Sequence, residues 1–99
     1  MPSDKMPSSE PSKQEGQKEV LVKNILEAAS RRWFYGNQKD KAKWMMNSEK
    51  EKEYQRLENQ YDDEFVAAQH AYQDVFGGAY EYSRTPEQIE AHIKEMGLK

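Results

Sequence analysis

Basic and aromatic side chains gather between residues 31 and 44, where the chain reads RRWFYGNQKDKAKW. This tract carries five Lys or Arg residues against one Asp, and it includes four aromatic residues. Arginine and aromatic side chains dominate the energetics of protein interfaces. The same mixture binds nucleic acids when cations neutralise phosphates and rings stack on bases. The candidate partner-binding residues are Arg31, Arg32, Trp33, Tyr35, Lys39, Lys43 and Trp44.

The spacing of the aromatics in this tract helps to choose between these uses. On a helix, the consecutive residues Trp33, Phe34 and Tyr35 point in directions 100° apart, so they cannot all face one core. At least one is exposed or covers another chain; the purely structural alternative is a corner where two helices meet. The net charge of −3 opposes nucleic-acid binding. We therefore expect a protein partner, with Arg32 or Trp33 as its anchor, and keep nucleic acid as the weaker alternative.

Catalytic and metal-binding chemistry has few candidate residues. The chain contains two histidines, His70 and His92, and no cysteine. Neither histidine follows a glutamate by three residues, as it would in the carboxylate-bridged metal sites of helical bundles. The acidic run at 62–64 lacks the alternating ligands and central glycine of a calcium loop. We expect no enzyme activity, no metal site and no cofactor.

Length and composition limit the size of the core. The chain has 99 residues, which is enough for one domain, and 33% of them are charged. Because the core is small, apolar surface that the chain leaves exposed could be buried by a partner or by a second copy of the chain. No apolar run approaches the roughly 20 residues that span a bilayer, and the first ten residues lack the apolar core of a secretory signal. With no cysteine present, we expect a cytoplasmic protein that makes no membrane contact.

The first residues differ in composition from the rest of the chain. Residues 1–16 are mainly Ser, Lys, Glu, Gln and Gly, with three prolines spaced through them. Such a segment cannot bury enough apolar surface to offset the entropy lost on ordering. The sequence therefore predicts a disordered tail over 1–16 and a single helical domain over 17–99.

Two helices are predicted in the first half of the domain. Over 17–35, the apolar residues Val22, Ile25, Leu26, Ala29 and Trp33 form one stripe. Gly36-Asn37 is expected to end this helix, because Gly tolerates positive φ and Asn caps the next helix. A short helix ending at the apolar residues 44–46 is then expected from residue 38.

The longest element is predicted over 48–76 and is expected to organise the fold. Its apolar residues recur at steps of three and four, which keeps them on one helical face; they are Tyr54, Leu57, Tyr61, Phe65, Ala68, Tyr72 and Phe76. Ser48 is the expected N-cap and Gly77-Gly78 the expected stop. Since no Pro or Gly interrupts 38–76, we favour one continuous helix over a break at Asn47-Ser48.

A last helix is predicted over 86–96. Thr85 and Gln88 match a capping box, Pro86 occupies the favoured first position, and Gly97 is the expected stop. The expected fold class is all-α. We expect the first helix to pack on the long central helix and the last helix to fold back onto its end.

These observations predict a non-enzymatic adaptor or regulatory protein that binds another protein. One alternative is a nucleic-acid-associated protein that uses the 31–44 tract. The other is a self-associating structural or assembly protein, in which the stripe of the central helix pairs with a second copy as a homo-oligomer.

Overall fold

The all-α prediction is confirmed by a computed structural model, which describes the backbone of residues 2–98 and the side chains of residues 16–98. The described chain forms three helices: α1 (Pro2–Trp44), α2 (Ser48–Phe76) and α3 (Pro86–Glu95). The backbone of α1 begins at Pro2, ahead of the predicted helix start at residue 17. The side chains of residues 1–15 fall outside this description, and the predicted disorder of residues 1–16 stays a prediction.

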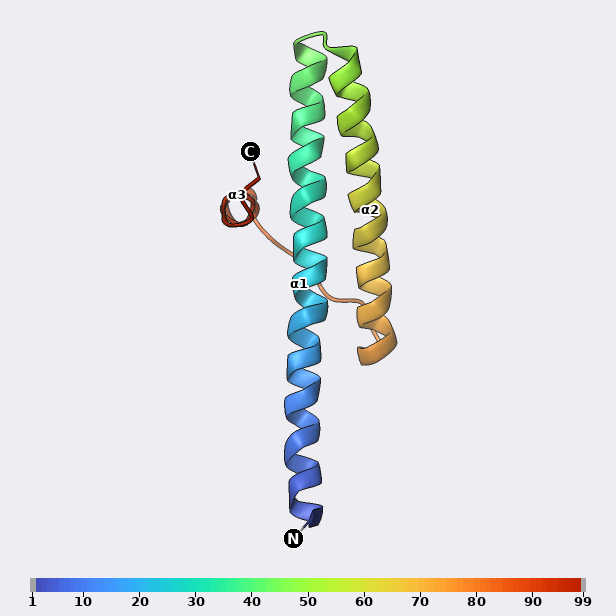
Figure 1. The fold of residues 1–99 in the computed structure, drawn as a ribbon, viewed down its shortest axis with the longest axis vertical. Coiled ribbons are helices and arrows are strands. Elements are labelled where there is room, and N and C mark those ends of the chain that lie inside the picture. Colours follow the sequence, from blue (N-terminus) through green and yellow to red (C-terminus); the bar gives the residue numbers. More distant parts are fainter. Residues whose placement is uncertain (1, 99) are drawn as a thin grey trace.

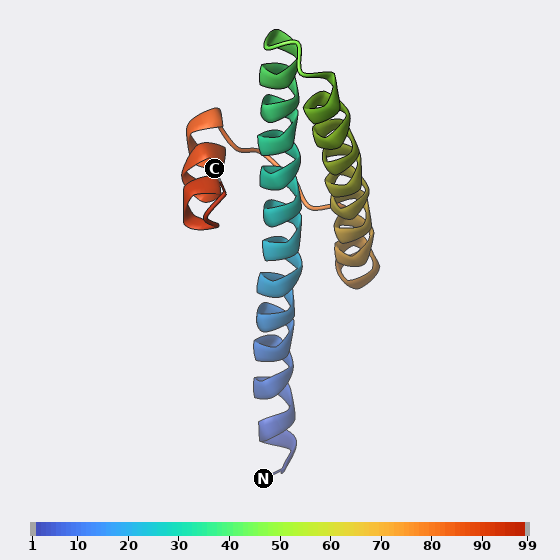
Figure 2. The same cartoon turned by 45° about the horizontal axis from the view of Figure 1, so that its top comes forward.

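The central element of the fold is α1. Helix α2 packs antiparallel along one side of α1, and α3 packs on another side (Figures 1 and 2). Among the described residues, α3 contacts α1 and makes no helix–helix contact with α2. The expectation that 48–76 organises the molecule was therefore wrong, as was the placement of the last helix on its end.

The predicted end of the first helix at Tyr35 was also wrong, because α1 passes through Gly36 and Asn37 without a break. A glycine inside a helix costs about 0.5–1 kcal/mol relative to alanine. Contacts to α2 on both sides of Gly36 outweigh this cost, since Tyr35 stacks on Tyr61 and Lys39 binds Glu58. A methyl group on Gly36 would lie 2.9 Å from Oε2 of Glu58, so the glycine also makes room for that carboxylate.

The favoured continuous helix over 38–76 was wrong, and the break near Asn47 is real. Met46 has a φ of 56°, and Asn47 caps α2 by accepting a hydrogen bond from the backbone N–H of Lys50. The cap is thus one residue earlier than the predicted Ser48. A straight helix over 38–76 would leave the apolar residues on both sides of Asn47 exposed to water. The reversal of the chain near Asn47 instead packs α2 against α1.

The predicted signals at the other helix ends are confirmed. Gly77 ends α2 with a φ of 80° and donates its N–H to the Gln73 carbonyl. Thr85 and Gln88 form the predicted capping box of α3, with Pro86 in its first turn. Gly97 follows α3 with a φ of 77°.

The linker between α2 and α3 is held against α2 before it reaches the far side of α1. The side-chain amide of Gln69 makes two hydrogen bonds to the backbone of Tyr80, at 2.9 and 3.1 Å. The Tyr82 ring meets Phe65 edge-on, with 5.5 Å between ring centroids. Helix α3 then buries Ile89 and Ile93.

The core is thin because the molecule is long and narrow, with extents of 68 × 23 × 19 Å. Its buried apolar residues come from α1 and α3: Ile25, Ala28, Ala29, Ala42, Ile89 and Ile93. No described residue of α2 is fully buried. The predicted stripe of α2 does face α1, but most of its side chains are only half-buried.

Candidate functional site

The structure divides the 31–44 tract between several surroundings, and its two arginines are engaged within the chain. Arg32 donates to Asp62 of α2 at 2.8 Å, and its guanidinium lies 5.0 Å from the centre of the Phe65 ring. Arg31 lies 3.9 Å from Glu27 and 5.8 Å from the Tyr61 ring centre. Both guanidiniums therefore help to join α1 to α2, and Arg32 is not a free anchor.

Tyr35 belongs to the contact between α1 and α2. Its ring stacks on Tyr61 and Tyr54, with centroid separations of 5.6 and 6.1 Å. Burial, reinforced by the neighbouring Tyr61, raises the pKa of Tyr35, and the Arg31 cation offsets part of the rise. The neutral phenol is thus the form that this contact favours.

Lys39 is also committed to α2. Its ammonium donates to Glu58 at 2.9 Å and to Gln55 at 3.1 Å. The hydrogen bond to Glu58 is the main reason that the pKa of Lys39 is raised. A lysine held in this way is a poor candidate for a phosphate contact.

Trp33 lies on the side of α1 that meets the last helix. It is half-buried, and with Phe34 it lines a hollow of about 230 Å³ that Ile93 and Leu98 also line. This position makes Trp33 a structural contact for α3. The expectation that it anchors an external partner has no support in this geometry.

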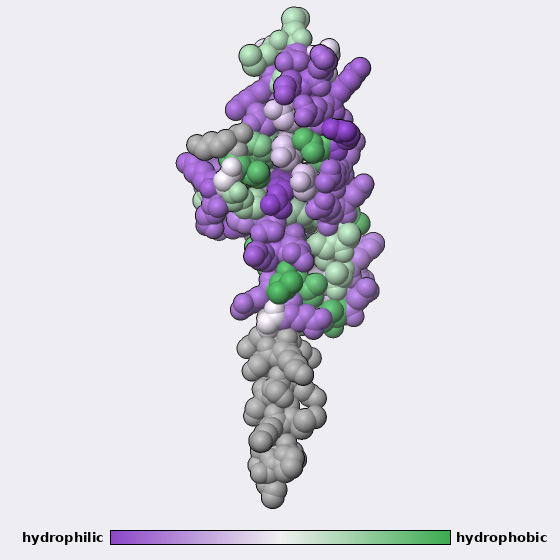
Figure 3. Space-filling model, viewed as in Figure 1, coloured by the Kyte–Doolittle hydropathy of each residue, from purple (hydrophilic) through white to green (hydrophobic). Residues whose placement is uncertain are grey.

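The remaining predicted residues, Lys43 and Trp44, lie at the end of α1, where the chain turns into α2. Trp44 is 87% exposed, Met45 79% and Met46 93%. We call these three residues the apical cluster. It lies at the end of α1 and in the turn that follows, at the top of Figure 1, and the space-filling view of Figure 3 shows pale green surface at this end.

The two methionines were missing from the predicted site. One sequence signal could have identified them. Three consecutive large apolar residues cannot share one helical face, and Asn47–Glu53 after them offers no apolar side chain for them to contact. At least one of the three side chains must therefore point away from the face on which the others pack.

The backbone of the cluster is unusual at Met46. Its φ of 56° is the only positive value at a non-glycine residue in the described chain. The left-handed conformation costs an L-residue about 1–2 kcal/mol, and Gly or Asn is the usual occupant. With Lys43, Asp40 and Trp44, Met46 also lines a hollow of about 490 Å³.

The charges around the apical cluster balance. Four lysines and four carboxylates lie within the flanking turns of α1 and α2: Lys41, Lys43, Lys50 and Lys52 against Asp40, Glu49, Glu51 and Glu53. This end of the molecule therefore has no excess positive charge to attract a phosphate backbone.

No described group of three His, Asp or Glu side chains could hold a metal ion. The hydroxyl of Ser30 lies 2.7 Å from Nδ1 of His92, a pairing that could activate a nucleophile if a substrate could reach it. Ser30 is fully buried, however, so this contact fastens α3 to α1.

No helix among the described residues has the length and apolarity needed to cross a membrane.

Comparison of the chain with protein-family models, curated proteins and solved structures found no match.

Proposed function

We propose that this chain is a non-enzymatic helical adaptor or regulatory protein that binds another protein through its apical cluster. The observation that carries the proposal is the exposure of three consecutive large apolar side chains, at 79–93%, on one turn. In the proposed assembly, Trp44 is the anchor, Met45 and Met46 fill the space beside it, and Lys43 lies at the rim. We place this activity in the cytoplasm, in keeping with a chain that has no cysteine.

The residue types favour a protein surface as the partner. Tryptophan is among the residues most enriched at the energetic centres of interfaces. Methionine side chains are flexible and polarizable, and they adapt to irregular apolar grooves. The balanced surrounding charge suits a partner groove with a mixed polar rim.

The backbone conformation of Met46 gives independent support. A glycine at this position would make the turn without the cost of the left-handed conformation. Methionine there adds nothing to the described core, because its side chain is 93% exposed. Its presence is explained if the side chain contacts a partner.

Nucleic-acid binding is the weaker alternative. Of the seven tract residues that could serve it, Arg32 and Lys39 are paired with Asp62 and Glu58. Self-association is the other alternative. It would use the same apical cluster against a second copy, because the stripe of α2 already faces α1 within the chain.

The first step of the test identifies the partner by crosslinking from a chosen position in the chain. A photo-crosslinking amino acid at position 45 is compared, in an extract of the native host, with the same probe at position 66, since Val66 is also exposed but lies on the flank of α2. A protein captured from position 45 alone is purified, and its affinity is measured by calorimetry. Trp44→Ala should weaken binding by about thirtyfold or more, as loss of an interface anchor does.

The control is Val66→Ala, which also truncates an exposed apolar side chain and should leave the affinity within about twofold. Equal affinities for the Trp44 and Val66 variants would overturn the proposal. Sedimentation of the purified chain over a range of concentrations separates self-association. A dimer that is lost in Trp44→Ala would show that the apical cluster mediates self-association and not binding of another protein.

A further inference from the structure

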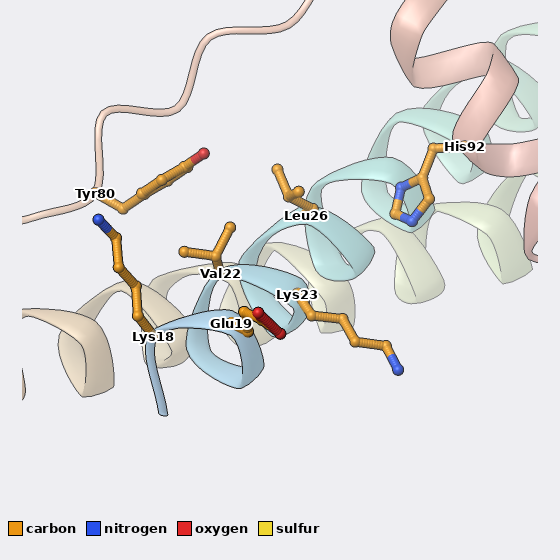
Figure 4. A pocket seen from close by; sticks show the side chains of 7 residues that line it. All are labelled: Lys18, Glu19, Val22, Lys23, Leu26, Tyr80 and His92. Atoms are coloured by element: carbon orange, nitrogen blue, oxygen red, sulfur yellow. The ribbon is translucent and has the colours of Figure 1, made fainter. Parts of the chain in front are cut away.

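A second surface feature lies away from the apical cluster, on the face of α1 between the linker and α3. It is a hollow of about 840 Å³. Val22 and Leu26 rise from α1 at its floor, Tyr80 of the linker lies above them, and His92 reaches in from α3 (Figure 4). Its volume lies within the range of about 300–1,000 Å³ that is typical of small-molecule sites.

The floor of the hollow can hold an apolar group. Val22 and Leu26 are half-buried, so each still presents part of its side chain to the hollow. The Tyr80 ring adds a flat apolar surface, and this residue is fixed by its two backbone hydrogen bonds to Gln69. When a ligand covers this exposed apolar surface and displaces water from it, the free energy of the complex is lowered.

The rim of the hollow is cationic, on a chain whose net charge is −3. Lys18 and Lys23 line it together with one acid, Glu19. Neither lysine makes an ion pair with another residue whose side chain is described. The guanidinium of Arg84 lies close by, 3.4 Å from Nδ1 of His92.

His92 adds an imidazole ring to the lining of the hollow. Its Nδ1 lies 2.7 Å from the hydroxyl of Ser30 and 3.4 Å from the guanidinium of Arg84, so this nitrogen is engaged within the chain. The ring therefore helps to fix α3 at one end of the hollow.

We propose that this hollow binds an amphipathic carboxylate, such as a medium-chain fatty acid. The alkyl chain lies on Val22, Leu26 and the Tyr80 ring, and the carboxylate is held at the rim by Lys18 or Lys23. An anionic head fits the excess of cations, and an alkyl body fits the floor. A phosphate-rich ligand fits less well, because the described residues that line the hollow lie within α1, α3 and the linker and include no helix N-terminus.

The probe is decanoate, added below its micelle concentration to the full chain and followed by ¹H–¹⁵N NMR. We expect saturable shifts at Val22, Leu26, Tyr80 and the His92 side chain. Decyltrimethylammonium and decyl maltoside share the alkyl chain but carry a cationic and a neutral head. Each should bind about tenfold more weakly than decanoate or worse, because neither supplies an anion.

The decisive variant is Lys18→Gln/Lys23→Gln, which should weaken decanoate binding about tenfold while leaving the fold intact, since both lysines are exposed. The matched control is Lys50→Gln/Lys52→Gln, which makes the same charge change on α2 and should leave the affinity unchanged. Equal binding of the three head groups, or equal weakening by the two variants, would overturn the proposal. So would shifts centred on the apical cluster, which would indicate general detergent-like binding.

Discussion

At the scale of single residues, the most informative feature is the conflict between Met46 and its backbone. A residue that lacks described packing contacts and occupies an unfavourable conformation lowers the stability of the free chain. Such strain is expected where a side chain serves function rather than folding. Stability and binding should therefore respond in opposite directions when Met46 is replaced.

We predict that Met46→Gly stabilises the chain and weakens partner binding. Removing the left-handed strain gains about 1–2 kcal/mol, and the greater freedom of glycine in the unfolded chain returns about 0.5–1 kcal/mol. The net gain should be about 0.5–1 kcal/mol in urea unfolding. Met45→Gly is the matched control, because Met45 is also exposed but has no positive φ.

The control variant should lose stability, since it adds glycine without relieving strain. If both variants changed the free energy of unfolding alike, the strain at Met46 would not be the cause. If Met46→Gly bound the partner as tightly as the native chain, the apical cluster would not need its side chain.

At the scale of the helices, the joint between α1 and α2 is built from polar and aromatic contacts as much as from apolar burial. Tyr35 stacks between Tyr54 and Tyr61, and Lys39 pairs with Glu58. Contacts of this kind depend on protonation states. The joint should therefore weaken at alkaline pH.

We predict that stability holds from neutral pH to about pH 9 and falls above about pH 10. Burial raises the pKa of Tyr35 and Tyr82 above the ordinary 10.0, and the bond to Glu58 raises that of Lys39 above 10.5. A group whose pKa is raised by folding contributes stability that is complete below its unfolded pKa and is lost as pH rises through its folded pKa. All three groups therefore act in the same direction.

Urea unfolding at a series of pH values measures this loss. The double variant Tyr35→Phe/Tyr82→Phe removes both phenols and should show a shallower alkaline fall than the native chain, because Lys39 is then the one of these three groups that remains. A fall of equal steepness in the two proteins would contradict the assignment to these tyrosines.

The helical fold class and the end signals at Gly77, Thr85 and Gly97 could be predicted from the sequence, but the bounds of α1 and the packing partners of the helices could not. Thr85, Gly77 and Gly97 act through their own turns, so local chemistry was sufficient to place them. The fate of Gly36 depends on Glu58, a residue from another helix, and no local rule includes that contact.

The candidate site shows the same difference between local signals and contacts that come from distant parts of the chain. Arg32 and Lys39 looked available in the sequence because Asp62 and Glu58 are far along the chain. Trp44 was predicted as a partner-binding residue; its side chain is 87% exposed at the start of the apolar run 44–46, and the predicted role stays a prediction.

At the scale of the whole molecule, α1 holds two separate attachments, one to α2 and one to α3. The attachment of α3 is small but well defined. It buries Ile89 and Ile93 and adds the hydrogen bond between the Ser30 hydroxyl and Nδ1 of His92. The opposite end of the chain, residues 1–16, has the composition of a segment that adds little burial.

The last prediction compares two truncations of similar length. Removing residues 1–16 should change the melting temperature by no more than about 1–2 °C, because a segment of this composition is expected to add little apolar burial. Removing residues 86–99 exposes the surface of α1 under Ile89 and Ile93 and leaves the buried Ser30 without its partner, which should cost about 2 kcal/mol or more. For a domain of this size, each kcal/mol corresponds to roughly 4–8 °C. Calorimetry of the two truncated chains should therefore show a difference of about 10 °C. A drop of several degrees on removing residues 1–16 would show that this segment packs on the helices, and the predicted boundary at residue 17 would then be wrong.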